Sequence, residues 1–381
     1  MDFTLTKELQ MLRKMYRDFA ENEIKPLAAE IDEKERFPKE SIPKLARYGF
    51  LGIPFPKKYG GQGGTNLAYA MAIEELAKCC TTTATIVAAH TSLCCYPIYA
   101  YGTEEQKMKY LPDLLSGRKL GAFGLTEPNA GSDASGQQTM AVLEGDHYVL
   151  NGTKCFITNA TEADTFVVFA MTDPHLGNHG ISAFIVEKDF PGFSIGKHEK
   201  KMGIRGSATS DLIFEDCIVP KENMLGKEGK GFKVAMGTLD GGRVGVAAQA
   251  MGIAEGAIEE TVKYTKERMQ FKKRISQFQN TQFQLADMKT RADAAQLLVY
   301  RAAAAKDAGD PNCGFYSAMA KLFASETASD VTRRAVQLFG GYGYTREYPV
   351  ERMMRDAKIT EIYEGTSEVQ RMVISGRMGV K

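Results

Sequence analysis

Apolar positions change their spacing along the chain, and the first part has the spacing of helices. Leu9, Leu12, Tyr16 and Phe19 recur at steps of three and four, with charged residues between them, so one stripe faces a core. Glycines and prolines interrupt the pattern up to about residue 120. We therefore expect several helices rather than one.

A long uncharged stretch lies inside this first part. No charged residue occurs between Lys78 and Glu104, which is long enough to raise the question of a membrane span. Because the stretch is rich in threonine and serine, we instead expect a helix buried inside protein, whose hydroxyls bond back to the preceding turn. The spacing of Thr103 and Gln106 predicts a capping box and a further helix that ends at Ser116.

The middle of the chain, from about residue 121 to 226, favours short strands. Glu144-Gly145-Asp146 and Asn151-Gly152 are typical of turns. Apolar runs of strand length occupy residues 165–171, 180–186 and 212–214. Such close spacing indicates an antiparallel sheet or small barrel rather than alternating strands and helices.

Strand signals disappear after residue 231. Helical patterns cover residues 232–269, 278–308, 315–339 and 350–362, enough for a four-helix bundle with a short terminal helix behind it. The predicted fold class is α+β multi-domain. Its parts are an N-terminal helical domain (1–120), a middle antiparallel β-barrel or sheet domain (121–226) and a C-terminal four-helix bundle (227–381).

Composition narrows the class of protein. Lys and Arg number 48 and Asp and Glu 47, so the net charge of +1 offers no field for nucleic acid or an anionic membrane. Seven cysteines without a CxxC pair favour reduced thiols in a cytosol-like compartment. The start of the chain carries acids and no apolar core of a signal peptide, so a cytoplasmic protein is expected.

Several common catalytic and cofactor motifs are absent from the sequence. It contains no G-x-G-x-x-G between a strand and a helix, no Walker loop, no HExxH and no GxSxG. The five histidines form no HExxH pair and have no CxxC pair beside them, so no metal is expected.

Glu364 is the strongest candidate for a chemical role. It stands in a loop just before a helix that a capping-box pattern at Ser367 predicts to begin there. Gly365 frees the backbone, so that the carboxylate can point into a cavity. Ile362 and Tyr363 offer an apolar surround, which raises the pKa of a carboxyl toward that of a useful base. A solvated loop carboxylate is the alternative.

Three further segments have a functional and a purely structural interpretation. Residues 123–133 gather hydroxyls and backbone donors suited to a ring edge or phosphate, or form a domain-junction turn. Residues 337–349 end a helix in glycines, which admits a bulky partner or serves as a helix stop. Asp240 and Arg243 are at surface ion-pair spacing. Phe156 alone is expected in a core.

Six strings together resemble the acyl-CoA dehydrogenase family in order and spacing, over essentially the whole chain. They are TEPNAGSD (126–133), FITN (156–159), RGSATSDLIFEDCIVP (205–220), LDGGR (239–243), QLFGGYGYTREYP (337–349) and YEGTSEVQR (363–371). The short-chain, butyryl-CoA dehydrogenase branch is the most similar. The resemblance implies FAD bound without a Rossmann unit, in a cleft between the β-domain and the bundle of a homotetramer.

The resemblance also assigns roles to individual residues. It implies that FAD is held by Phe123, Gly124, Leu125, Thr126, Ser132, Phe156, Ile157, Thr158, Arg268, Phe271, Gln279, Gln337, Leu338, Gly340, Gly341, Thr366 and Glu368. Among them, Arg268, Gln279 and residues 337–341 would hold the pyrophosphate and adenosine across a subunit boundary. Substrate would meet Ser132, Asp240, Arg243 and Gly365. Glu364 would be the catalytic base, and its backbone N–H would donate to the thioester oxygen.

The activity that the resemblance implies is α,β-dehydrogenation of a short-chain acyl-CoA, butyryl-CoA to crotonyl-CoA or the reverse, with electrons passed to electron-transfer flavoprotein. Three positions depart from relatives. Phe156 replaces a common tryptophan, Lys272 replaces a common glycine, and Gly242 stands where other branches carry their base. An acyl-CoA oxidase and a non-catalytic CoA-binding or assembly protein are the alternatives.

Overall fold

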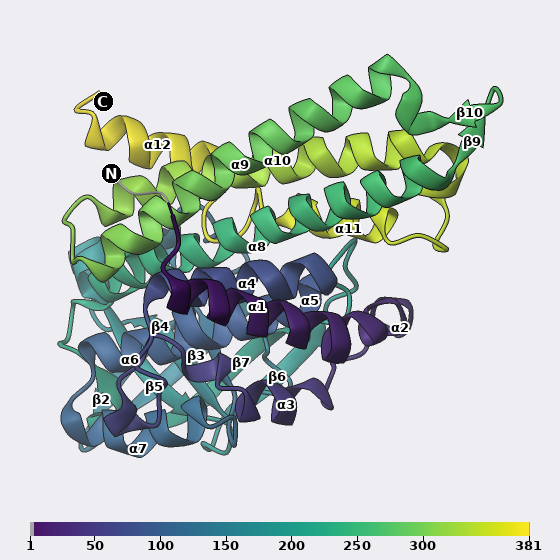
Figure 1. Ribbon diagram of the computed structural model, residues 1–381. Coiled ribbons are helices and arrows are strands. Elements are labelled where there is room, and N and C mark those ends of the chain that lie inside the picture. The colour runs from purple at the N-terminus through teal and green to yellow at the C-terminus, as the bar shows by residue number, and fades with distance from the viewer. Residues whose placement is uncertain (1–3, 381) are drawn as a thin grey trace.

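Helices, then a sheet, then long helices follow one another along the chain in the computed structural model, which describes residues 4–380. Figure 1 shows the long helices lying across the N-terminal helices and the sheet. The N-terminal α-helices are α1 (Lys7–Phe19), α2 (Ala28–Lys34), α3 (Ser41–Arg47), α4 (Asn66–Cys79), α5 (Thr81–Ala88), α6 (Tyr96–Tyr101) and α7 (Glu104–Leu115).

The uncharged stretch forms buried helix, as predicted. It comprises α5, the π-helical segment Ala89–Cys95 and α6. Thr85 Oγ1 donates to the carbonyl of Thr81 at 2.9 Å, the back-bonding expected of a hydroxyl inside protein. Within residues 4–380, no helix is long and apolar enough to cross a membrane.

The predicted capping box at the start of α7 is confirmed. The Gln106 N–H donates to Thr103 Oγ1 at 3.2 Å, and the Thr103 N–H donates to Gln106 Oε1 at 3.0 Å. The Gln106 amide also donates to the carbonyls of Glu222 and Met224. The same side chain therefore starts a helix and ties it to the β region.

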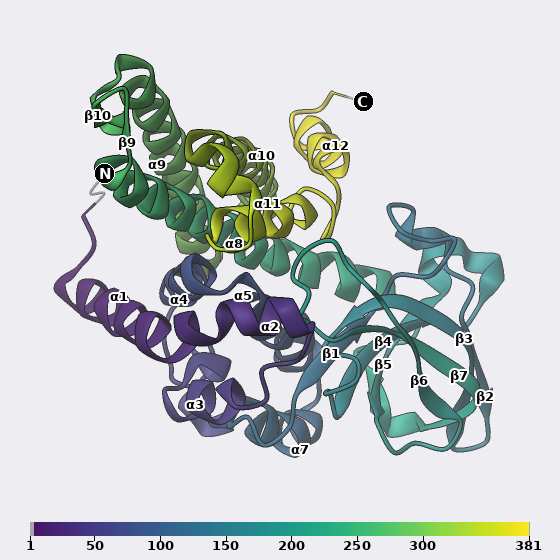
Figure 2. The ribbon, with the colours of Figure 1, turned by 90° about the vertical axis from the view of Figure 1, so that its right-hand side faces the viewer.

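The middle region is a sheet with the strand order β6-β7-β3-β2-β4-β5-β8. Its strands are β1 (Gly121–Gly124), β2 (Met140–Glu144), β3 (His147–Thr158), β4 (Thr165–Met171), β5 (Ile181–Glu187), β6 (Phe193–His198), β7 (Thr209–Pro220) and β8 (Met224–Leu225). Most pairs are antiparallel, as predicted, whereas β1 and β2 both run parallel to β4. Figure 2 shows this sheet as a curved unit beside the N-terminal helices.

The predicted turn at Asn151-Gly152 is wrong. Strand β3 continues through it, and its register against β7 shifts between Leu150 and Gly152. The backbone of Gly152 has φ +147°, and a methyl group there would lie 2.8 Å from Thr139 Cα. The Asn-Gly pair therefore makes a bulge rather than a hairpin turn. The turn at Gly145 is confirmed, because β2 and β3 pair directly on either side of it.

The C-terminal region is the predicted bundle. Its helices are α8 (Gly231–Glu267), α9 (Gln279–Asp307), α10 (Cys313–Phe339), α11 (Val350–Ile359) and α12 (Ser367–Arg377). The hairpin β9 (Met269–Gln270) and β10 (Lys273–Arg274) projects at one end, and α12 lies toward the other (Figure 1).

The main core joins the bundle to the N-terminal helices, chiefly where α8 packs on α4. Gly252 of α8 permits the contact, because a methyl group there would overlap the Glu74 carbonyl and lie 2.8 Å from Ala77 Cβ. A second apolar cluster lies where the N-terminal helices meet the sheet, and a third fills the β region. Helix α8 therefore forms a rigid support for the surrounding residues.

Candidate active site

The loop between α11 and α12 turns through two left-handed residues, Glu364 (φ +50°) and Gly365 (φ +95°). The helix after it begins one residue away from the prediction. Thr366, not Ser367, is the N-cap, and its Oγ1 accepts from the Val369 N–H at 3.2 Å. Because both adjacent hydroxyl residues can cap, the sequence pattern placed the cap one position late.

Two side chains hold the carbonyl of Gly365. Lys321 Nζ donates to it at 2.7 Å, and Gln370 Nε2 donates to it at 2.7 Å and to the Glu364 carbonyl at 3.2 Å. Lys321 comes from α10 and is fully buried. The loop is thus fixed from two helices, and neither Lys321 nor Gln370 was a sequence-predicted site residue.

The Glu364 side chain is half-buried and faces α8. A methyl group at Gly242 would lie 3.7 Å from Glu364 Cγ and 2.8 Å from Leu93 Cδ2. Burial raises the pKa of Glu364 to about 7, and the positive charges of Lys321 and Arg243 oppose that rise. A carboxyl with this pKa suits general base catalysis near neutral pH.

The apolar surround of Glu364 is only partly the predicted one. Ile362 is 48% exposed, so the prediction that it shields the carboxylate is wrong. Tyr363 turns to α8, where its hydroxyl donates to Gln249 Oε1 at 2.7 Å. Leu93 lies on the Glu364 side of α8 instead, and no pattern at that position distinguished it from an ordinary core leucine.

Asp240 and Arg243 form an ion pair near this carboxylate. Arg243 NH1 and Asp240 Oδ1 are 2.6 Å apart, and Arg243 is 5% exposed. The surface-pair interpretation is therefore wrong. Burial raises the pKa of Asp240 and lowers that of Arg243, as expected for charges withdrawn from water.

The loop after β1 lies against the end of β3. The Cys155 N–H donates to the Thr126 carbonyl at 2.8 Å. Beneath it, the fully buried Lys154 donates to the Leu125 carbonyl at 3.2 Å and to Glu127 Oε1 at 2.7 Å. Gly124 is buried against Leu212. The ion pair supports the predicted cofactor-binding loop from inside.

The predicted cofactor residues of β3 face different ways. Phe156 is 63% exposed with φ +60°, so it is not the core residue that its type alone suggests. Ile157 is buried in the β core, and Thr158 is half-buried. Ser132 is exposed, and Phe123 packs edge-on against Phe169. Phe156 is therefore free to meet a ring outside the sheet.

The π-helical segment Ala89–Cys95 joins the β1 edge to the Glu364 loop. The Gly121 N–H at the start of β1 donates to His90 Nδ1 at 3.0 Å. Three residues further on, Leu93 adjoins Gly242, which also faces Glu364. The residues around β1 and those around Glu364 thus belong to one region.

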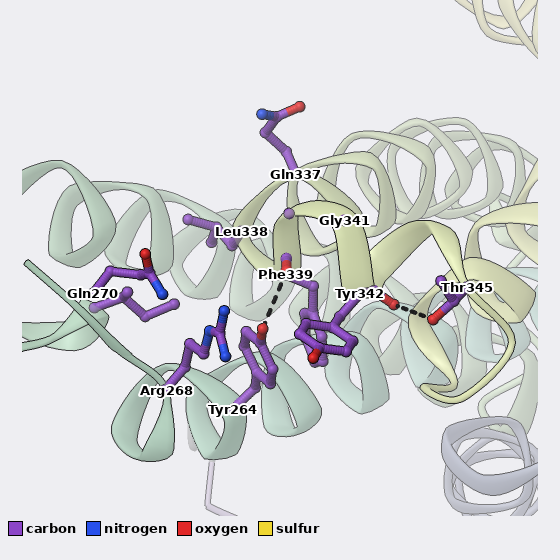
Figure 3. A pocket seen from close by; sticks show the side chains of 11 residues that line it. Tyr264, Arg268, Gln270, Gln337, Leu338, Phe339, Gly341, Tyr342 and Thr345 are labelled. Carbon is purple, nitrogen blue, oxygen red and sulfur yellow. Dashed lines mark hydrogen bonds between the residues drawn. The ribbon is translucent and has the colours of Figure 1, made fainter.

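A second group of predicted residues lies at the other end of α8, around a cavity of about 490 Å³ (Figure 3). Its lining residues are Tyr264, Arg268, Gln270, Ile275, Gln337, Leu338, Phe339, Gly340, Gly341, Tyr342 and Thr345. The structure brings together five predicted residues: Arg268, Gln337, Leu338, Gly340 and Gly341. The Gln337 amide points away from Arg268 in Figure 3.

Aromatic rings form much of the wall of this cavity. Tyr264 stacks on Phe339 with ring centroids 4.0 Å apart, and the Arg268 guanidinium lies 5.3 Å from the centroid of the Tyr342 ring. Sequence reasoning missed Tyr264, although it stands four residues before Arg268, the residue that directly follows α8. The Arg268 N–H donates to the Tyr264 carbonyl at 2.9 Å, so the two residues lie together at the end of this helix.

Four residues that were predicted to contact the cofactor do not line this cavity. Two lie near it in the chain, and two lie at the start of α12. Phe271 is 86% exposed in the hairpin and Gln279 is exposed at the start of α9. Glu368 is exposed in the first turn of α12, and Thr366 is half-buried at its cap. Their roles toward a cofactor stay predictions.

The two regions fit the two ends of a flavin dinucleotide. Arg268 lines the cavity with a cation of the kind that pairs with a pyrophosphate, and a methyl group at Gly340 or Gly341 would enter open space, so their backbone is approachable. The exposed Phe156 and the polar loop at Thr126 suit a ring system. From residue 243 to residue 267, α8 spans about 36 Å. The two regions of one and the same chain therefore lie far apart.

Within residues 4–380, no group of three or more His, Cys, Asp or Glu side chains is placed to hold a metal ion. The structure therefore combines a half-buried glutamate of raised pKa with an exposed aromatic side chain and a polar loop suited to an organic ring cofactor, outside the Rossmann class.

Family models match all three regions: the acyl-CoA dehydrogenase N-terminal domain at residues 6–118, the middle domain at 122–217 and the C-terminal domain at 229–379. The chain belongs to the acyl-CoA dehydrogenase family and is a flavin-dependent oxidoreductase whose cofactor is FAD.

Similar proteins cover almost the whole chain. A short-chain specific acyl-CoA dehydrogenase of Clostridium acetobutylicum is 63% identical over 99% of this chain and 100% of its own. Butyryl-CoA dehydrogenase of Megasphaera elsdenii is 55% identical, with TM-score 0.97 over 99% of this chain and 100% of the other. A chain in a structure of the electron transferring flavoprotein of Acidaminococcus fermentans is 58% identical, with TM-score 0.98 over 99% of each chain.

Proposed function

We propose that this protein interconverts short-chain acyl-CoA and enoyl-CoA, butyryl-CoA to crotonyl-CoA or the reverse, with Glu364 as the base for the α-proton. The observation that carries the proposal is the position of Glu364 opposite Gly242, with its pKa raised to about 7. The similarity to short-chain specific relatives supports the chain length.

Glu364 performs the proton half of the reaction. In dehydrogenation its ionised carboxylate takes the proton from the carbon next to the thioester, and its raised pKa brings the base closer in strength to that weak acid. Its backbone N–H donates to the thioester oxygen, where negative charge develops. The chemistry that FAD supplies when bound is acceptance of the hydride from the β-carbon, which balances the new C2–C3 double bond.

Other residues position the substrate and the cofactor. The ion pair of the half-buried Asp240 and the buried Arg243 meets the substrate beside Gly365, and Ser132 lies along the CoA arm. Thr126 and Phe156 contact the ring system. Because about 36 Å of α8 separates this region from the cavity at Arg268, two copies of the chain complete each cofactor site, as in a homotetramer.

Electron-transfer flavoprotein is the proposed electron partner, supported by the similarity to the chain seen with the flavoprotein of Acidaminococcus fermentans. A cytoplasmic location is part of the proposal. All seven cysteines are free thiols, which fits a reducing compartment.

The test uses purified, flavin-loaded protein and butyryl-CoA. Bleaching of the flavin absorbance is expected for the wild type and is expected to fall at least 1000-fold in Glu364→Gln, because the amide cannot take a proton. The matched control is Glu361→Gln, whose side chain pairs with the exposed Lys358. This control should bleach at the wild-type rate.

Three outcomes would overturn the proposal in different ways. Normal turnover by a yellow, folded Glu364→Gln protein would reject the base. Rapid oxygen consumption with butyryl-CoA would indicate an oxidase. A protein that takes up no FAD would favour a non-catalytic binding protein.

A further inference from the structure

Lys321 is a buried cation to which the proposed reaction, as described so far, assigns no role. It lies in the first half of α10, fully buried, in a helix whose other inward residues are mostly alanine, serine and threonine. A lysine is almost never fully buried without a specific partner. Its partner here is the backbone carbonyl of Gly365, at 2.7 Å.

That carbonyl belongs to the most constrained part of the site. Glu364 and Gly365 both have positive φ, and a non-glycine residue adopts that conformation at a cost unless its surroundings hold it. Gln370, also fully buried, donates to the same carbonyl at 2.7 Å. Two donors from two helices therefore fix the peptide that follows the base.

We propose that Lys321 is a positioning residue for the reaction: with Gln370 it locks the Glu364-Gly365 turn, and with its positive charge it favours the ionised form of Glu364. This inference rests on the proposed function, in which Glu364 is the base and its backbone N–H meets the thioester oxygen.

The charges around Glu364 support the second part of the proposal. Lys321 from α10, Arg243 from α8, Tyr69 from α4 and Tyr363 from the loop interact electrostatically with it. Burial raises the pKa of both tyrosines, so they are neutral at pH 7. The cations are thus the groups that act on the carboxylate.

The two cations are not equivalent. Arg243 is paired with Asp240 at 2.6 Å, which offsets much of its charge, whereas Lys321 donates to a neutral carbonyl. Burial lowers the pKa of Lys321 to about 8, against the attraction of Glu364, so Lys321 is still protonated at pH 7. Its charge opposes the effect of burial on Glu364 more than any other group does.

The test compares three flavin-loaded variants. Lys321→Met removes the donor and the charge, Lys321→Arg keeps the charge, and Gln370→Met removes a donor without changing charge. Two properties are measured for each: the pH dependence of kcat and KM with butyryl-CoA, which gives the pH at which kcat/KM is half-maximal, and hydrogen–deuterium exchange of the backbone amides of residues 361–367.

In Lys321→Met the half-maximal pH should rise by about one unit or more, and kcat at pH 7 should fall about tenfold or more, with little change in KM. Lys321→Arg should keep the wild-type pH. Gln370→Met should lower kcat and speed exchange in the loop while its half-maximal pH stays unchanged. Lys358→Met, at an exposed position near the loop, is the control and should change neither property.

A folded Lys321→Met protein with unchanged half-maximal pH and unchanged loop exchange would overturn the inference. If that variant fails to fold, Gln370→Met decides, because wild-type exchange and kcat in it would contradict the lock. A wild-type protein that never bleaches with butyryl-CoA would instead reject the proposed function, while the exchange measurements would still test the lock.

Discussion

Glu364 takes up its proton near neutral pH, because burial raises its pKa from 4.5 to about 7. A base acts in its ionised form, so kcat/KM for butyryl-CoA should increase about tenfold per pH unit below about pH 7 and level off above it. Flavin bleaching followed at several pH values measures this. Glu361→Gln should keep the same profile, and a profile level down to pH 4.5 would contradict the assignment.

The same carboxyl affects stability with the opposite sign. Because its pKa is higher in the folded protein than in the unfolded chain, the stability it contributes is present below pH 4.5 and is lost as the pH rises through about 7. Above about pH 7 Glu364 is ionised, which the reaction requires, but in this form it contributes least to the stability of the folded protein.

Single residues of the site were predictable to different degrees. Glu364 was accessible from sequence, because a glycine and a helix start beside a glutamate form a readable local pattern. Lys321 was not, since a lysine inside a long helix resembles a surface position until the neighbouring helices are placed. Leu93 was equally hidden, because a leucine beside Gly242 and an ordinary core leucine have the same local sequence signal.

Close helix packing determines the stability of the largest elements. At Gly252, where α8 meets α4, a methyl group would overlap backbone, so Gly252→Ala should destabilise the protein by about 1–3 kcal/mol despite better helix propensity. Gly376→Ala in α12 is the matched control. No atom lies within 4 Å of its added methyl group, and it should gain about 0.5–1 kcal/mol.

Urea unfolding of the two glycine variants provides the measurement. Equal free energies of unfolding for both would show that helix propensity, and not the α4–α8 contact, dominates at Gly252. The long helices themselves were predictable from apolar spacing. The bulge at Gly152 was not, because an Asn-Gly pair serves hairpin turns and bulges alike, and only the register against β7 distinguishes them.

At the scale of the whole molecule, Arg355 connects all three regions. It binds Asp32 of α2 at 2.6 Å, Glu351 of its own helix at 2.7 Å and the Met202 carbonyl at 3.1 Å. The neighbouring Asp356 accepts from the Ile204 N–H at 2.5 Å. The order of the three regions could be predicted, but this connection could not, because its members lie far apart in the sequence.

Arg355→Leu leaves the mostly buried carboxylate of Asp32 without its cation, so the free energy of unfolding should fall by about 3–5 kcal/mol. Arg346→Leu is the control, since Arg346 and Glu33 are both more than 60% exposed, and should cost about 0–1 kcal/mol. Thermal and urea unfolding of both variants would measure the difference. Equal losses would contradict the role of Arg355.

The length of α8 has a genetic consequence if each cofactor site is shared between two copies. A subunit with a damaged Glu364 loop still offers a sound cavity at Arg268, and a subunit damaged at Arg268 still offers a sound loop. When two such alleles are expressed together, a mixed pair of subunits contains two sites. One site combines the intact loop with the intact cavity, and the other combines the two damaged parts. Two inactive genes of this family can therefore complement each other inside one cell.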